Sequence, residues 1–222
     1  MRRLVGTACL AALLVLSMHP GVARASWVGD NCRPNHYDDS HVRRKDALAY
    51  AEVARNEGYE WGGGCWNNNN RDDSPGAPDS NGEGPDCSGF TFKTWEMKSP
   101  RGTGGFRWYD KLENIHGPYA SYHFHSPQGN YPFSKISKSR SVTMYMDAFA
   151  KNGHVGMLYT KSNPGAGTDY IIEARGEAYG TDVWERSYRG DSAYVAIRRE
   201  GWTPDCWPNC SQSPAVQLVV VP

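Results

Sequence analysis

The sequence has no excess of charge of either sign and no long apolar run. It contains 24 Lys and Arg residues against 24 Asp and Glu residues, for a formal net charge of zero. A nucleic-acid partner usually requires a concentrated basic surface, so this balance argues against one. No stretch approaches the roughly 18 continuous apolar residues that are typical of a transmembrane helix, so a membrane span is not expected.

The N-terminal segment over residues 1–25 has the pattern of a secretory signal. Arg2 and Arg3 give a positive start, residues 4–16 are mostly apolar, and Ala23-Arg24-Ala25 is a small-x-small cleavage pattern. Removal of this segment takes away three arginines and leaves 21 basic residues against 24 acidic ones, a net charge of −3. We therefore expect a secreted protein that is cleaved after Ala25.

An odd number of cysteines remains after that cleavage: Cys32, Cys65, Cys87, Cys206 and Cys210. Exported chains tend to oxidise their thiols in pairs, so the leftover cysteine serves either another molecule or chemistry that needs a free thiol. We expect two disulfides and a free Cys87. Cys206 with Cys210 and Cys32 with Cys65 is one pairing, and crossed pairings stay open because spacing does not fix connectivity.

The order of the local patterns predicts one α+β domain over residues 42–200. Apolar positions at helical spacing indicate a helix over 42–57, and a second helix is expected from Cys87 to about residue 97. Short β-prone runs follow at residues 142–149, 154–159, 169–174 and 193–197. Helices first and an antiparallel sheet second are typical of this class. The segments without a regular period are a lead over 26–41, a loop insertion over 65–85, an aromatic-rich stretch over 101–140, and a linker and tail over 201–222.

A cysteine at a helix start suits nucleophilic catalysis because the thiolate is the reactive form. Unpaired N–H groups at a helix N-terminus lower the pKa of a thiol, so the predicted helix start at Cys87 favours this role. Ser88 and Gly89 are small enough to let a substrate carbonyl approach, and the amide beside the sulfur is a candidate oxyanion donor. The alternatives for Cys87 are a buried structural thiol and a third disulfide partner.

His154 is the candidate base and Glu173 the candidate orienting group. If residues 154–159 and 169–174 form a hairpin, a symmetric register pairs residues whose numbers sum to 327 and sets His154 opposite Glu173. Cross-strand neighbours have Cβ atoms about 5 Å apart, so the carboxylate can bind one imidazole nitrogen while the other points at the thiol. The predicted site is Cys87, His154 and Glu173, with Asn152 as an alternative third residue.

Several ordered segments resemble the motifs of NlpC/P60 cysteine peptidases. They are Gly-Tyr-Glu-Trp-Gly-Gly at residues 58–63, Asp-Cys-Ser-Gly-Phe at 86–90, Met-Asp-Ala-Phe at 146–149 and Gly-His-Val-Gly-Met at 153–157. The resemblance covers about residues 42–175. It implies a papain-like α+β fold, with N-terminal helices packed on a small antiparallel sheet, and an endopeptidase that cleaves bacterial cell-wall stem peptides. It further implies a monomer without a cofactor, with Cys87 as nucleophile, His154 as base, and Tyr59, Trp61, Asp86 and Ser88 as substrate-binding residues.

The chain departs from this family at two places. Glu173 stands where the family usually has His, Asn or Gln, although the related CHAP amidases often have Glu there. The segment over residues 65–84 is also longer than the usual link between the two motifs that it joins, which leaves the substrate class open. An amidase, a deamidase or an acyltransferase that uses the same site as a secreted effector is therefore an alternative, as is an inactive wall-binding protein.

Two short patterns contain metal-binding residue types, but no metal is expected at either. His123 and His125 flank Phe124, but no Cys or carboxylate at ligand spacing accompanies them. Residues 79–83 alternate oxygen-bearing side chains but lack a complete calcium-binding loop. Ordinary loop histidines and a solvated turn are the simpler interpretations.

Overall fold

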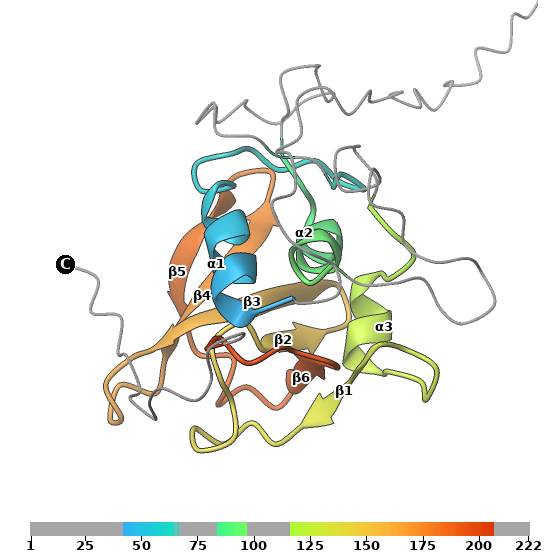
Figure 1. Cartoon of the computed structure of the whole chain (residues 1–222). Coiled ribbons are helices and arrows are strands. Elements are labelled where there is room, and N and C mark those ends of the chain that lie inside the picture. The colour runs from blue at the N-terminus through green and yellow to red at the C-terminus, as the bar shows by residue number, and fades with distance from the viewer. Residues whose placement is uncertain (1–41, 65, 67–83, 97–115, 207–222) are drawn as a thin grey trace, which may run out of the picture.

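The computed structural model describes residues 42–64, 66, 84–96 and 116–206, which form an α+β fold (Figure 1). Within these residues the helices are α1 (Arg44–Glu52), α2 (Cys87–Thr94) and α3 (Ser121–His125). The strands are β1 (Phe133–Ile136), β2 (Ala148–Lys151), β3 (His154–Lys161), β4 (Asp169–Gly176), β5 (Gly180–Arg186) and β6 (Val195–Arg199). The predicted α+β class is confirmed. The expected signal segment, the lead, the loop at residues 79–83 and the tail from residue 207 lie outside the described residues.

The strands form one antiparallel sheet in the order β1-β6-β2-β3-β4-β5. The sequence did not predict β1 or β5, and both are edge strands of this sheet. An edge strand buries fewer side chains, so its apolar alternation is weak: in β1 only Phe133 is buried. The other four strands correspond to predicted runs, although β2 and β6 begin later than expected.

The first predicted strand is wrong over residues 142–147, which form a turn instead. Its alternating apolar side chains suggested extended backbone, but the buried carboxylate of Asp147 bends the chain. Asp147 accepts a hydrogen bond of 2.8 Å from the amide of Met144 and pairs with Arg44 at 2.9 Å and Arg198 at 2.7 Å. Met146 adopts a positive φ of 62° beside it. These partners come from distant parts of the chain, so the local sequence pattern did not reveal the turn.

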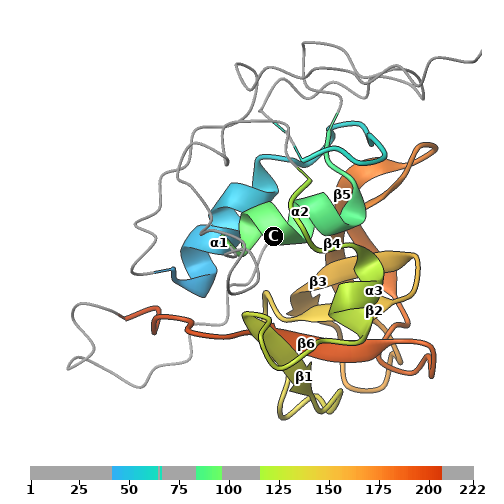
Figure 2. The same cartoon turned by 90° about the vertical axis from the view of Figure 1, so that its right-hand side faces the viewer.

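The helices differ from the expected block of N-terminal helices packed on the sheet. Figures 1 and 2 show α1 and α2 side by side over one face of the sheet. The main sheet contacts of α2 are with β3 and β4, and α1 packs on α2. α3 lies against β2, although it comes from the stretch in which no structure was predicted. α1 ends at Glu52, before the predicted residue 57.

Apolar side chains fill both faces of the sheet. On the helix side, Phe90 and Trp95 are buried with Met157 of β3 and Ile172 of β4, as the second predicted helix implied. On the opposite side, a smaller cluster contains Phe149, Leu158, Ile171, Tyr188, Tyr194 and Ala196. α2 therefore lies in the centre of the molecule, and every residue from Cys87 to Thr94 is buried.

We expect Gly89→Ala to destabilise the fold by about 1–3 kcal/mol, the usual cost of overpacking. Alanine is the better helix former by about 1 kcal/mol, but close packing outweighs that gain. A Cβ atom on Gly89 would lie 2.2 Å from the carbonyl oxygen of Gly63, in a loop bound to the start of α2. Urea unfolding measures the change.

Gly129→Ala is the matched control, because a Cβ atom there would meet no other atom within 4 Å. It should change the free energy of unfolding by less than about 0.5 kcal/mol. A Gly89→Ala variant as stable as the wild type would contradict the close approach of the loop to α2.

Candidate active site

Cys87 is the first residue of α2, and Asp86 is the N-cap that fixes this helix start. The Asp86 carboxylate accepts hydrogen bonds from the amide of Gly89 at 2.7 Å and from the amide of Gly62 at 3.0 Å. The first bond caps the helix, and the second ties the loop over residues 58–64 to it. The Cys87 thiol is free and only 7% exposed. The predicted helix start and free thiol are therefore confirmed.

The electrostatic environment of the thiol differs from the sequence-based expectation. Burial, and after it the negative charge of Asp86, raise the pKa of Cys87 to about 12. Hydrogen bonds from Val155 and Ser88 lower the pKa but do not offset these effects. The expected lowering by the helix N-terminus is thus outweighed, because the residue that caps the helix also places a carboxylate beside the sulfur. Cys87 is a neutral thiol at physiological pH and needs a base.

His154 is the first residue of β3, and its imidazole contacts Glu173 of β4 as predicted. The Nε2 atom of His154 lies 2.5 Å from Oε2 of Glu173. The backbone of Val155, the next residue, hydrogen bonds to the Cys87 thiol. The start of β3 therefore carries both the imidazole and the backbone group that binds the thiol. Nε2 is bound to the carboxylate, so Nδ1 is the ring nitrogen that does not contact Glu173.

The predicted register of the hairpin is wrong by two residues. Met157 pairs with Ile172 and Leu158 with Ile171, and a bulge follows before Thr160. A shift of two residues keeps every side chain on its own face, so the predicted partners still meet diagonally. Gly156 makes this contact possible, because a Cβ atom there would lie 2.9 Å from Oε2 of Glu173.

Two further residues position Glu173, and neither was predicted. The hydroxyl of Tyr188 donates to Oε2 of Glu173 at 2.7 Å, and Nε of Arg186 lies 3.2 Å from Oε1. Arg186 also donates to the Tyr188 hydroxyl at 2.9 Å. Burial, and then the charge of Glu173, raise the pKa of Tyr188, so this hydroxyl stays a donor. Arg186 ends the unpredicted strand β5 and Tyr188 follows it, which explains why the sequence pattern did not reveal them.

The predicted substrate-binding residues differ in burial and in their contacts. Burial raises the pKa of Tyr59, and electrostatic interaction with Cys87 and Asp86 raises it further. The Trp61 side chain is 79% exposed. The side chains of Asp86 and Ser88 are buried and engaged in hydrogen bonds, with each other and with His116. His116, from the stretch without predicted structure, was missed because no periodic pattern marks it.

The histidines considered for metal binding have other partners. His123 accepts a hydrogen bond of 2.9 Å from the amide of Ala120, and His125 contacts the hydroxyl of Ser126 at 3.1 Å. Over the described ranges, no group of three His, Cys, Asp or Glu side chains is arranged to bind a metal ion. In the same ranges no helix has the length and apolarity needed to cross a membrane.

Of the remaining cysteines, Cys206 is disulfide-bonded. Cys32, Cys65 and Cys210 lie outside the described residues. The connectivity and the number of disulfides therefore remain predictions.

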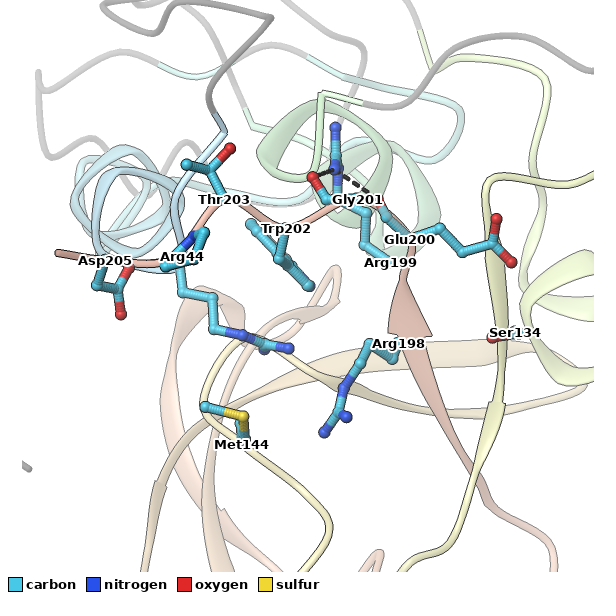
Figure 3. Close-up of a pocket in the computed structure, with 11 residues that line it drawn as sticks. Arg44, Ser134, Met144, Arg198, Arg199, Glu200, Gly201, Trp202, Thr203 and Asp205 are labelled. Carbon is cyan, nitrogen blue, oxygen red and sulfur yellow. Dashed lines mark hydrogen bonds between the residues drawn. The ribbon is translucent and has the colours of Figure 1, made fainter. Parts of the chain in front are cut away.

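A pocket of about 450 Å³ lies between the start of α1 and the end of β6, apart from the candidate site (Figure 3). Arg44, Arg198 and Met144 point toward a common space beside Trp202. Both arginines are already paired with Asp147. The pocket contains neither a free thiol nor a histidine. It therefore offers no alternative centre for cysteine chemistry.

Cys87, His154 and Glu173 have the residue types that a thiol hydrolase uses as nucleophile, base and orienting carboxylate, and the His154–Glu173 contact is formed. Comparison of the chain with protein-family models, curated proteins and solved structures finds no match. The interpretation of this site therefore depends on its residues and their geometry.

Proposed function

We propose that this protein is a secreted cysteine endopeptidase with a papain-like fold that cleaves peptide bonds of bacterial cell-wall peptidoglycan. The observation that carries the proposal is the 2.5 Å contact of His154 with Glu173, next to the backbone group that binds the Cys87 thiol. The similarity of the sequence motifs to those of NlpC/P60 peptidases supports the choice of substrate. No cofactor takes part in this reaction.

The reaction begins with transfer of the Cys87 proton to Nδ1 of His154 as the sulfur attacks a peptide carbonyl. Because the pKa of the thiol is about 12, the base must accept the proton in or immediately before this step. Glu173 then stabilises the imidazolium through Nε2. The backbone N–H of Cys87, at the first position of α2, has no intrahelical acceptor, so it can donate to the oxyanion.

His154 transfers the protons in both half-reactions. The imidazolium returns the proton to the leaving amine, the carbon–nitrogen bond breaks, and a thioester remains on Cys87. His154 next takes a proton from water, whose oxygen attacks the thioester carbon. The carboxylic acid leaves, and the proton returns to the sulfur. Tyr59, which interacts electrostatically with Cys87, and the exposed Trp61 are the side chains that we expect to contact the substrate.

Digestion of purified peptidoglycan tests the proposal. The protein without residues 1–25 should release fragments with new peptide termini, and Cys87→Ala should release none, because the variant has no nucleophile. Mass spectrometry identifies the termini. Glu200→Gln, in the separate pocket, is the control and should digest like the wild type.

The possible products separate this function from its alternatives. Fragments cut between sugar and peptide would indicate an amidase, and a loss of one ammonia per side chain would indicate a deamidase. Identical results for the wild type and Cys87→Ala would overturn the proposal and favour a wall-binding protein. Trapping a covalent adduct on Cys87 would then show whether the thiol reacts at all.

A further inference from the structure

His116 is a titratable residue beside the nucleophile that the proposed mechanism does not use. Its Nε2 atom lies 3.0 Å from Oδ2 of Asp86 and 2.7 Å from Oγ of Ser88, the two residues that flank Cys87. Its Nδ1 atom lies 2.9 Å from the carbonyl oxygen of Gly117. Both ring nitrogens therefore have defined partners.

These partners favour the imidazolium form of His116. A backbone carbonyl oxygen and a carboxylate oxygen can only accept hydrogen bonds, so bonds to Gly117 and Asp86 together require an N–H group on both ring nitrogens. Only the imidazolium has an N–H group on both nitrogens. The Ser88 hydroxyl fits this arrangement, because it can accept from Nε2 while it donates to Oδ1 of Asp86, 3.2 Å away.

The backbone keeps the ring in this position. Gly117 has a φ of +84°, and a Cβ atom on it would lie 2.3 Å from the ring of Phe92, in the middle of α2. The chain therefore passes against α2 immediately after His116. The imidazole is about three-quarters buried, with 24% of its side chain exposed.

We propose that His116 is a positioning residue for Cys87, and that its imidazolium offsets the negative charge of Asp86 and keeps the thiol able to react. The inference rests on the proposed function, since a reactive thiol is what gives this control a purpose. Loss of the His116 proton would leave Asp86 uncompensated beside the sulfur. Cys87 would then be less reactive than it is when His116 is protonated.

The electrostatics of the cluster agree with this geometry. Burial lowers the pKa of His116, but the hydrogen bond to Asp86 and the charge of Asp86 raise it more, so the net shift is upward. Burial comes first, and Asp86 second, among the causes that raise the pKa of Cys87. Below the pKa of His116 the Asp86 charge is offset, and above that pKa it acts on the thiol in full.

Other charged or titratable groups face the same cluster. Tyr59, from the loop before α2, interacts with Cys87, and His154 precedes Val155, whose backbone binds the thiol. His123 of α3 faces His116, and Glu60 and Glu177 act on Tyr59. A comparison of the wild type with a His116 variant cancels their contributions, because both proteins contain all of these groups.

The rate at which iodoacetamide alkylates Cys87 tests the proposal without any substrate. We expect His116→Gln to react about tenfold more slowly than the wild type near pH 5, which corresponds to about one pKa unit of the thiol. The two rates should converge as the pH rises through the pKa of His116. A merely structural role of His116 would not produce a ratio that depends on pH in this way.

Two controls accompany this measurement. His125→Gln makes the same substitution on α3, outside the cluster, and should match the wild type at every pH. In the double variant Asp86→Asn and His116→Gln, both charges are absent, so alkylation near pH 5 should recover to the wild-type rate or above. The asparagine keeps an acceptor oxygen for the helix cap.

A second measurement uses the wild type alone, so it tests the proposal even if the His116 variant does not fold. NMR titration of the His116 ring should show an imidazolium at about pH 6.5, the ordinary midpoint for histidine. A neutral ring at that pH, or a wild-type to His116→Gln ratio that is constant with pH, would overturn the proposal. If alkylation follows the expected pH dependence but peptidoglycan is not cleaved, the role of His116 would stand and the proposed endopeptidase function would be wrong.

Discussion

His154→Ala is expected to lower peptide-bond cleavage by about 10²–10⁴-fold, the range of general-base contributions. The backbone next to His154 binds the Cys87 thiol, whose pKa of about 12 keeps it protonated at neutral pH. Without the imidazole, no positioned base removes that proton as the sulfur attacks. The rate of release of wall peptides from purified peptidoglycan measures the loss.

The fold should survive this substitution. His154 begins its strand, and its ring contacts the Glu173 carboxylate and the edge of the Tyr188 ring, with ring centroids 5.9 Å apart. It is not part of either apolar cluster. Circular dichroism and the midpoint of thermal unfolding check this point, with His125→Ala as the matched control. A variant that unfolds would identify His154 as a structural histidine, and full activity would remove it from the mechanism.

Glu173→Ala should have the largest effect on stability, a loss of about 3–5 kcal/mol, as expected when one partner of a buried pair is removed. The Glu173 carboxylate is fully buried and contacts His154, Tyr188 and Arg186. Alanine leaves a cavity and takes the acceptor from the Tyr188 hydroxyl. Urea unfolding measures the change in free energy, and cleavage should fall as well because the imidazole loses its orienting partner.

Glu173→Gln separates orientation from charge. An amide oxygen directed at His154 and Tyr188 keeps both hydrogen bonds, and the amide nitrogen then faces Arg186, which is partly exposed and can turn to solvent. Activity should therefore decrease in the order wild type, Gln, Ala. The Gln variant keeps the orientation of the imidazole but lacks the negative charge that stabilises the imidazolium during proton transfer.

Glu185→Gln is the control for this series, since it makes the same change at an exposed position of β5 that bonds to Thr168. It should leave stability and activity within the error of the wild-type values. Wild-type activity in Glu173→Ala would exclude Glu173 as the orienting group. Asn152 or a backbone carbonyl would then be the candidate.

The extent to which the sequence predicted the site depends on how local each signal is. Cys87 as the first helical residue follows from neighbours in the chain, and the structure has this helix start, with Asp86 as a cap that was not predicted. The contact between His154 and Glu173 was predicted correctly from an incorrect register, because an error of two residues preserves the face of a strand. An error of one residue would have separated the two side chains.

Sequence alone thus determined the features that depend on short spacing: the α+β order of elements, the start of α2 and the face shared by His154 and Glu173. Only the tertiary structure decided the features that depend on long-range contacts. Arg186, Tyr188 and His116 reach the site from edge or irregular segments, which carry no apolar period. The pKa of Cys87 likewise depends on burial and on the orientation of the Asp86 carboxylate, and both arise only when the chain packs around α2.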